Sequence, residues 1–215
     1  MNHQNHIIEL FAGFSTNNKE KREMKANCTV TLIKGENKIV LVDTMTAWDK
    51  DVLLKELKFH HVAPEDVDYL VCTHGHSDHC GNMNLFLKAT HFVGSCVSHK
   101  HMYYYHDFEN NPYKLDNNIE VIFTPGHTST CVSVIVKNTN LDHGRSVAIV
   151  GDLFEREEDI FDESLWIEAG TEDEKKQRIN RLKIAEMVDF IIPGHGGRFA
   201  VTEEIRQKLR EDIKQ

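Results

Sequence analysis

Short apolar runs separated by polar turns make up most of the chain. Runs of this length, rich in valine, isoleucine and phenylalanine and bounded by turn residues, predict β-strands. We expect strands at residues 7–14, 28–33, 39–42, 69–72, 90–93, 119–123, 131–136, 146–150 and 190–192. Gly35 and Asn37 lie between two of these runs, which predicts a hairpin over residues 28–42.

Longer segments have apolar residues at helical spacing, and they predict helices over residues 48–59, 81–88, 172–187 and 202–213. The first of these helices carries four apolar side chains on roughly one face: Val52, Leu53, Leu57 and Phe59. The third repeats the spacing with Ile179, Leu182, Ile184 and Met187. Thr202 is a good N-cap for the last helix. Polar residues at 17–25 and 138–144 predict loops.

The order of these elements favours a sandwich of two sheets. Each half of the chain runs through strands and then a helix, and an acidic residue ends one strand in each half, Asp43 and Asp152. This repetition predicts two similar halves packed face to face, with helices outside two mixed β-sheets. The fold class is therefore α+β, an αββα sandwich. A chain of 215 residues is long enough for one large core, and we expect residues 1–215 to form a single domain.

Charge and cysteine content limit the classes of function. A formal charge of −9 argues against loose binding to a phosphate backbone, although bound cations would make a local site positive. The five cysteines are dispersed, odd in number and form no C-x-x-C pair. We interpret them as reduced thiols, as in a cytoplasmic or nuclear protein. No apolar run is long enough to span a bilayer, so we expect no membrane insertion.

Residues 73–82, with the sequence THGHSDHCGN, hold the densest group of candidate ligands. His74 and His76 are two positions apart in an extended segment, so their side chains point to the same side. Asp78 and His79 follow where the chain begins to coil and can turn toward a second point. Imidazoles and carboxylates are metal ligands, and one stretch could thus serve two cations. A histidine-rich surface loop is the alternative, which the buried strand before the motif disfavours.

Three further ligand candidates follow apolar strands singly. His127 and His195 each end a Pro-Gly-His tripeptide, in which proline ends the strand and glycine permits a tight turn. Asp152 follows the run at 146–150, where a buried carboxylate is unfavourable unless it is paired or binds metal. Taken alone, Asp152 could instead cap a helix. Asp43 is a better candidate for orienting a ligating histidine.

These motifs, in this order, resemble the metallo-β-lactamase-fold hydrolases from about Cys28 to Val201. The resemblance implies two zinc ions at one edge between the sheets. By residue match, one zinc would be held by His74, His76 and His127, and the other by Asp78, His79 and His195. Asp152 would bridge them. The true β-lactamases carry a cysteine at the position of Asp152, which argues against lactam hydrolysis. Iron or manganese could replace zinc.

One branch of the family shares the sequence motifs around His74, Asp152 and His195. Its members are of similar length and have no appended domains. That resemblance implies a cytosolic and nuclear endoribonuclease acting on histone pre-mRNA 3′ ends, with single-stranded RNA as partner and a homodimer as the assembly. The two cations would lower the pKa of a shared water and make a bridging hydroxide available, which Asp78 would orient.

Residues 98–118 are the candidate substrate-contacting lid, an exposed loop of a length that is usually functional or mobile. Its tyrosines could stack on bases and its histidines could donate a proton, or all could be solvent-exposed polar residues. The candidates are His99, His101, Tyr103, Tyr104 and Tyr105, with His106 a further histidine of the segment.

Three other functions are compatible with the same site. A thioesterase or lactonase acting on a small ester or thioester, like glyoxalase II, would need the same ligands. A persulfide dioxygenase would bind one iron with part of the set, whereas the full set of seven favours two metals. A metal-binding scaffold without catalysis is the weakest alternative, because nothing is missing from the ligand set.

Overall fold

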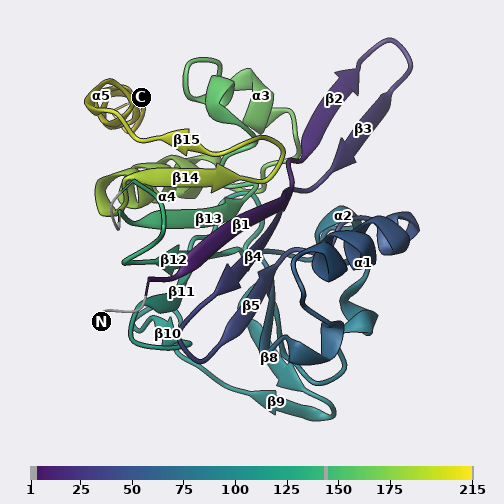
Figure 1. The fold of residues 1–215 in the computed structure, drawn as a ribbon. Helices are drawn as coiled ribbons and strands as arrows, with labels where there is room; N and C mark the ends of the chain where they lie inside the picture. Colours follow the sequence, from purple (N-terminus) through teal and green to yellow (C-terminus); the bar gives the residue numbers. More distant parts are fainter. Residues whose placement is uncertain (1–3, 143–144, 215) are drawn as a thin grey trace.

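Two β-sheets packed face to face form the centre of the protein in a computed structural model that describes residues 4–142 and 145–214 (Figure 1). The first sheet has the spatial order β1-β4-β5-β6-β7-β8-β9. Its strands are β1 (His6–Phe11), β4 (Val30–Lys34), β5 (Ile39–Val42), β6 (Tyr69–Cys72), β7 (Thr90–Val93), β8 (Cys96–His99) and β9 (Met102–Tyr104). The second sheet follows the order β10-β11-β12-β13-β14-β15. Its strands are β10 (Tyr113–Lys114), β11 (Ile119–Phe123), β12 (Val132–Val136), β13 (Val147–Gly151), β14 (Phe190–Pro193) and β15 (Phe199–Ala200).

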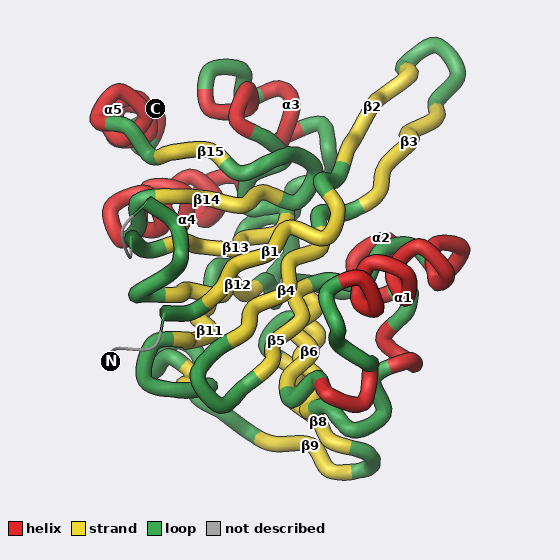
Figure 2. Tube along the Cα trace, viewed as in Figure 1, coloured by secondary structure: helices red, strands yellow, loops and turns green. Residues whose placement is uncertain are grey.

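Helices cover the outer faces of both sheets (Figure 2). The α-helices are α1 (Lys50–Phe59), α2 (Ser77–Cys80), α3 (Ser164–Ile167), α4 (Glu174–Met187) and α5 (Glu203–Asp212). The 3-10 turns are η1 (Ala47–Asp49), η2 (Pro64–Asp66), η3 (Met83–Leu85) and η4 (Glu157–Ile160). Both sheets are mixed, since β5, β6 and β7 run parallel, as do β13 and β14, and the other pairs are antiparallel. The predicted αββα sandwich is confirmed.

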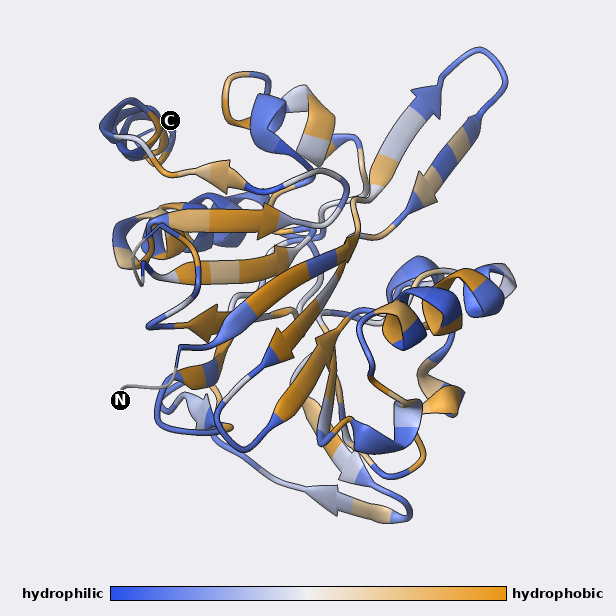
Figure 3. Cartoon of the chain, in the orientation of Figure 1, coloured by the Kyte–Doolittle hydropathy of each residue, from blue (hydrophilic) through white to orange (hydrophobic). Residues whose placement is uncertain are grey.

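Apolar side chains fill three layers. Figure 3 shows that many strands of the sandwich are coloured as hydrophobic. Between the sheets, Val42 and Val71 of the first sheet join Val134 and Ile149 of the second in one buried cluster. A second cluster packs α4 and α5 on the outer face of the second sheet. A third places α1 on the outer face of the first. The sheets are thus fixed on both faces, and the strand ends at their common edge are free to carry polar side chains.

That edge lies where β5, β6, β13 and β14 reach their carboxyl ends. The two sheets touch there directly, because the backbone N–H of Val132 donates to the carbonyl of Thr73 at 3.0 Å. Gly151, with a positive φ of 53°, packs so closely on Thr73 that a Cβ would overlap its side chain. Residues that follow these strands are therefore brought together from both halves of the chain.

Two segments differ from the sequence prediction. The predicted loop at 17–25 belongs to a hairpin of β2 (Phe14–Asn18) and β3 (Glu23–Asn27), which projects from the sandwich (Figure 1). Its strands are mostly solvent-exposed, so no apolar alternation marks them. Residues 81–88 contain the 3-10 turn η3 and not the predicted helix, because the single turn of α2 ends at Cys80, just before this segment. Residues 143 and 144 of the predicted turn at 138–144 lie outside the described residues.

The predicted apolar faces are also narrower than expected. Leu53 and Leu57 of α1 are buried, but Val52 is 42% and Phe59 74% exposed. On α4, Ile184 is buried while Ile179 and Met187 are exposed. Each helix rests on its sheet along one stripe, and apolar residues at the margin of that stripe remain in solvent. Among the described residues, no helix is both long and apolar enough to cross a membrane.

Candidate metal centre

The contiguous half of the site follows β6. The chain stays extended through His76, whose φ and ψ are −70° and 148°, and then coils into α2. His74 and His76 therefore come from the extended part, whereas Asp78 and His79 come from the helical turn. His74 and His79 are completely buried. The change of backbone conformation after His76 divides the four side chains into two pairs.

The other half comes from three separate loops. His127 follows β11, Asp152 follows β13 and His195 follows β14. All three are buried. Gly194 lies so close to Asp152 that a Cβ at this position would overlap Asp152 Oδ1. The glycine of this Pro-Gly-His turn is thus required by a close approach to the neighbouring strand end.

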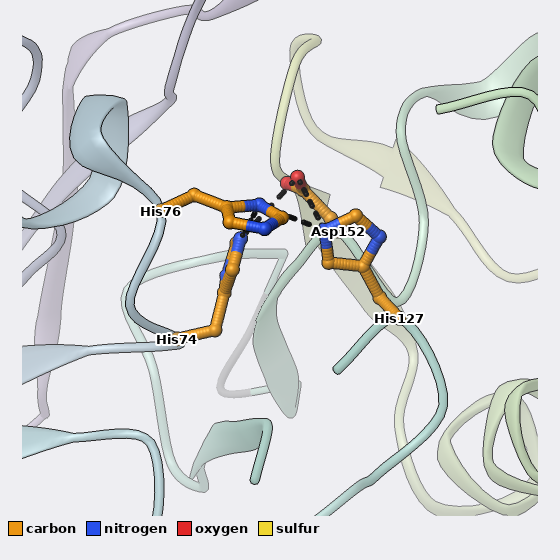
Figure 4. Close-up of side chains that lie close together, drawn as sticks. All are labelled: His74, His76, His127 and Asp152. Atoms are coloured by element: carbon orange, nitrogen blue, oxygen red, sulfur yellow. Dashed lines mark hydrogen bonds and ion pairs between the residues drawn. The ribbon is translucent and has the colours of Figure 1, made fainter. Parts of the chain in front are cut away.

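Three imidazoles and one carboxylate oxygen converge on one point (Figure 4). His76 Nδ1 lies 2.9 Å from His74 Nε2 and 3.1 Å from His127 Nε2. Asp152 Oδ2 lies 3.6 Å from His74 Nε2 and 3.4 Å from His127 Nε2. Four ligands placed tetrahedrally around a zinc ion stand about 3.3 Å apart. These atoms therefore fit one cation, and we call His74, His76, His127 and Asp152 the first cation position.

A second set shares the same carboxylate. Asp152 Oδ1 lies 3.1 Å from His79 Nε2 and 3.3 Å from His195 Nε2. Asp78 Oδ2 lies 3.9 Å from His79 Nε2 and 3.8 Å from His195 Nε2. We call Asp78, His79, His195 and Asp152 the second cation position. Asp152 Oδ2 faces His74 and His127, and Oδ1 faces His79, while His195 Nε2 lies 3.3 Å from both oxygens. Asp152 is thus shared between the two sets, as a carboxylate that bridges two cations would be.

Unsatisfied polar atoms support this fit. Within the described part of the chain, His79 Nε2 and Asp152 Oδ1 are buried and lie 3.1 Å apart, but neither has a hydrogen-bond partner in suitable geometry. A buried polar group without a partner is destabilising by about 1–3 kcal/mol. The ring nitrogens of His74, His76 and His127 face one another, and only a proton or a cation between them relieves their lone-pair repulsion. The donor set of imidazoles and carboxylates is the set that divalent transition metals prefer.

The outward ring nitrogens of His74, His79 and His195 have other partners. His79 Nδ1 lies 2.9 Å from Asp43 Oδ2, and His195 Nδ1 lies 3.0 Å from the carbonyl oxygen of Asn27. Thr73 Oγ1 lies 3.2 Å from His74 Nδ1, and its backbone N–H donates to Asp43 Oδ1 at 2.7 Å. Such contacts fix the tautomer and the orientation of a ligating imidazole. The structure places Asp43 where it can orient His79.

Two imidazoles of the first position and both imidazoles of the second have pKa values shifted in opposite directions. Burial lowers the pKa of His74 well below its usual value and also lowers the pKa of His127. Burial acts in the same direction on His79, but Asp152 and Asp43 outweigh it and hold its pKa well above the usual value. For His195, Asp152 likewise outweighs burial and raises the pKa to about 9. The second position therefore attracts positive charge more strongly than the first.

The structure does not bring the predicted lid residues to this cluster. His99 and His101 lie at or beside the turn between β8 and β9, and His99 Nδ1 is 3.2 Å from the carbonyl oxygen of Ala89, just before β7. Because β7 runs parallel to β6, that is the end of the sheet opposite His74. The predicted exposed loop at 98–118 is also wrong, since it contains strands and buries Phe108 and Leu115.

The three tyrosines belong to the same edge hairpin. Tyr103 and Tyr104 lie on β9, and Tyr105 follows it. All three are exposed, with Tyr105 fully so. They do not contact the ligand cluster in any interaction found among the described residues. A role for them in base stacking stays a prediction.

Sequence reasoning missed three buried residues beside the site. Gln177 of α4 donates from Nε2 to the carbonyl of Asp152 at 2.9 Å, and Asn180 donates to the carbonyl of Pro125 at 2.7 Å. Both side chains thereby hold ligand-bearing loops. Glu155 lies three residues after Asp152 with its carboxylate near His195. Two features of the sequence could have revealed them. Gln177 and Asn180 are polar residues at helical spacing on α4, and Glu155 is an acidic residue directly after the apolar pair Leu153 and Phe154.

Comparison with known proteins agrees with this geometry. The model of the metallo-beta-lactamase superfamily matches residues 25–121. Metallo-beta-lactamase domain-containing protein 1 of Xenopus laevis is 43% identical over 180 residues, which cover 82% of this chain and 74% of that protein. The Homo sapiens protein of the same name is 35% identical over 208 residues, covering 95% and 76%. The chain thus spans about three quarters of both relatives.

Solved structures with low sequence identity share the fold. A mutant of AiiA from B. thuringiensis with N-decanoyl-L-homoserine bound at its active site superposes with a TM-score of 0.63 at 17% identity, covering 90% of this chain and 92% of that one. The metallo-beta-lactamase FIM-1 from Pseudomonas aeruginosa, in its mono-zinc form, has a TM-score of 0.62 at 14% identity, covering 94% and 91%. The sequence relatives and the shared fold lead to one conclusion. This chain belongs to the metallo-beta-lactamase superfamily of metal-dependent hydrolases.

Proposed function

We propose that this chain is a dinuclear zinc hydrolase that cleaves phosphodiester bonds in single-stranded RNA, as an endoribonuclease of the type that acts on histone pre-mRNA 3′ ends. The observation that carries the two-metal part is the position of Asp152, whose two oxygens face two different sets of imidazoles. A single-metal enzyme, such as an iron persulfide dioxygenase, has no need of the second set.

The chain's own residues account for the chemistry. In this proposal, bound zinc ions supply a water whose pKa lies near neutrality and positive charge that stabilises a developing oxyanion. Asp152 holds the two ligand sets in register. Asp78 is half-buried and approaches His79 and His195 with Oδ2, so its other oxygen could accept a hydrogen bond from the attacking water and orient it. Asp43 and Asn27 keep His79 and His195 in the required orientation.

The β2–β3 hairpin supports RNA as substrate. Both of its feet touch the site: Ser15 donates to Glu155 at 3.1 Å, and Asn27 accepts from His195. The part that projects carries four basic side chains, Lys19, Lys21, Arg22 and Lys25, against the acidic Glu20 and Glu23. In a chain with a net charge of −9, the hairpin whose feet touch the candidate metal centre thus carries a basic tip, on which Lys19 pairs with Glu168 at 2.8 Å. Lysine and arginine next to a cleavage site are suited to phosphate contacts.

An exposed tryptophan lies on the other side of the same foot. Trp48 of η1 is 89% exposed, and its neighbour Asp49 accepts a hydrogen bond from Asn27 at 3.0 Å. The carbonyl of Thr46, just before η1, accepts from Asn82 at 2.7 Å, directly after the ligand-bearing helix α2. An apolar ring held in solvent by a tethered turn is a platform on which a base can stack.

A substrate panel with metal analysis tests the proposal. The purified protein is assayed for metal content and for cleavage of single-stranded RNA, a thioester, a lactone and glutathione persulfide. We expect two zinc equivalents and RNA cleavage that a chelator abolishes. Lactone or thioester hydrolysis without RNA cleavage would favour the small-molecule activity. One equivalent of iron with oxygen consumption would instead support the dioxygenase.

Surface variants test the RNA contacts separately from the metals. We expect Lys21→Glu with Arg22→Glu to raise the KM for RNA by about tenfold or more, because two phosphate contacts become repulsive. Trp48→Ala should raise it by about tenfold through lost stacking. Lys55→Glu, an exposed charge change on α1, is the matched control. An unchanged KM in the hairpin and Trp48 variants would contradict RNA recognition at this face.

Cytoplasmic or nuclear location and homodimerisation stay predictions. Cell fractionation would test the location, and light scattering would test the assembly.

A further inference from the structure

Glu155 lies on the inner side of the second cation position. Its side chain is buried, and Oε2 lies 3.9 Å from His195 Nε2. Asp152, Glu155 and His195 each offer one potential ligand atom, and these three atoms lie within 4.8 Å of one another. The nitrogen that Glu155 approaches is the one that faces Asp152, whereas the outward Nδ1 of His195 is taken by Asn27. Glu155 therefore does not act as an outer partner of the imidazole.

The carboxylate of Glu155 lacks the partners that a buried acid needs. Ser15 Oγ donates to Oε2 at 3.1 Å, but Oε1 is buried and has no hydrogen-bond partner. In an apolar environment such an oxygen is destabilising. The other oxygen, Oε2, lies 3.9 Å from His195 Nε2, within the spacing of about 3–4 Å between ligands of one zinc ion. A cation bound by this carboxylate at the second position would compensate for the missing partner of Oε1.

The backbone holds Glu155 rigidly beside His195. The N–H of Glu155 donates to Asp159 Oδ2 at 2.6 Å, and the N–H of His195 donates to the carbonyl of Glu155 at 2.8 Å. Asp159 in turn accepts from the buried Arg181 at 2.6 Å. A side chain on a backbone clamped at both polar groups is preorganised and loses little entropy on binding a ligand.

We propose that Glu155 is a further carboxylate ligand of the second cation position, an inference that rests on the two-cation site of the proposed function. The first position then offers three nitrogens and one oxygen, while the second offers two nitrogens and three carboxylates: Asp78, Asp152 and Glu155. Carboxylates suit manganese, whereas imidazoles suit zinc, copper and iron. The second position is therefore the one that accepts a harder cation.

Metal titration of the apoprotein tests this inference without an activity assay. Bound Mn²⁺ is counted by electron paramagnetic resonance, and Zn²⁺ affinity is measured by competition with a chromogenic chelator. Glu155→Gln removes the charge at nearly constant shape, and Glu155→Asp keeps the charge but withdraws it by one methylene. Glu157→Gln, exposed on η4, is the matched control. Urea unfolding of each apoprotein checks that the variants fold, and we expect Glu155→Gln to be at least as stable as the wild type.

We expect both Glu155 variants to bind the second Mn²⁺ about 10–100-fold more weakly, with the first site unchanged and a smaller loss for Zn²⁺. Wild-type affinity in Glu155→Gln would overturn the inference. So would wild-type affinity in Glu155→Asp, because charge alone would then explain the effect. A wild type that binds a single cation overturns this inference together with the two-metal proposal. Two cations and the Glu155 effect without RNA cleavage would overturn only the substrate.

Discussion

The two cation positions are built from the same residue types but differ in charge. The first has three imidazoles and shares one carboxylate, and burial lowers the pKa of two of its imidazoles, His74 and His127. The second adds Asp78 to the shared carboxylate, and the pKa values of His79 and His195 are raised. Burial lowers the pKa of all four imidazoles, but Asp152 and Asp43 outweigh it at His79, and Asp152 and Glu155 outweigh it at His195. One fold edge thus offers two environments for two cations.

The strongest test of this comparison removes what the two positions share. Asp152→Ala should lower activity by about three orders of magnitude or more, because both cations lose a ligand and the barrier loses several kcal/mol of electrostatic stabilisation. Metal content should fall below two equivalents, measured by atomic emission on the purified variant. Two full metal equivalents in Asp152→Ala would exclude the bridging role.

A smaller change tests whether the close packing at Gly194 positions the carboxylate that the two cation positions share. A Cβ at Gly194 would overlap Asp152 Oδ1, so Gly194→Ala should displace the shared carboxylate. A displacement of about 1 Å costs on the order of a hundredfold in rate. Gly197→Ala is the control, because no atom lies within 4 Å of a Cβ there. Equal turnover and metal content in the two variants would show that the contact does not position Asp152.

The contact between Asp43 and His79 allows the metal affinity of the second cation position to be lowered without changing the first. Asp43 Oδ2 lies 2.9 Å from His79 Nδ1, and loss of such a partner typically costs about 10–100-fold in metal affinity. We expect Asp43→Asn to show this loss at the second position in chelator competition, with the first position nearly unchanged. An equal loss at both positions would mean that Asp43 supports the whole edge through Thr73 rather than His79 in particular.

The ligand set could be predicted from sequence because each ligand follows an apolar strand. Cys72, Phe123 and Ile192 end such runs, and the residues just after them are presented at a sheet edge whatever the details of packing. The division of residues 74–79 into two pairs was also predictable, since an extended segment followed by a helix turns its side chains apart. The chain itself encodes these placements locally.

The remaining features depend on contacts between distant segments. Glu155 faces His195 only because β13 and β14 are neighbours, and Gln177 reaches Asp152 only because α4 packs on that sheet. The β2–β3 hairpin has little apolar alternation because most of its residues face solvent. The predicted lid failed for a similar reason. Its buried Phe108 and Leu115 stand alone among polar residues, so their packing in the core is invisible in the sequence.

The opposite pKa shifts of the two positions should be measurable in the stability of the metal-free protein. A group whose pKa is higher in the folded state stabilises the fold at low pH and loses that contribution as pH rises through the folded value. His195, with a pKa raised to about 9, therefore loses its contribution above about pH 6.5. Burial raises the pKa of Glu155 from 4.5 to about 8, so folding loses stability between about pH 4.5 and pH 8 as this carboxyl ionises, which overlaps the range for His195. His74 has the opposite sign and destabilises the fold below about pH 6.5.

We therefore expect the free energy of unfolding of the apoprotein to fall by on the order of 2 kcal/mol between pH 6.5 and 8.5, as followed by urea titration. This window lies below the range in which the unfolded chain's thiols fully ionise. The metal-loaded protein should not lose this stability, because bound cations require deprotonated ligands and bind more tightly as pH rises. The gap between apo and loaded protein should thus widen with pH. An apoprotein whose stability is flat or rises over this window would show that the carboxylates do not hold protons on the second position.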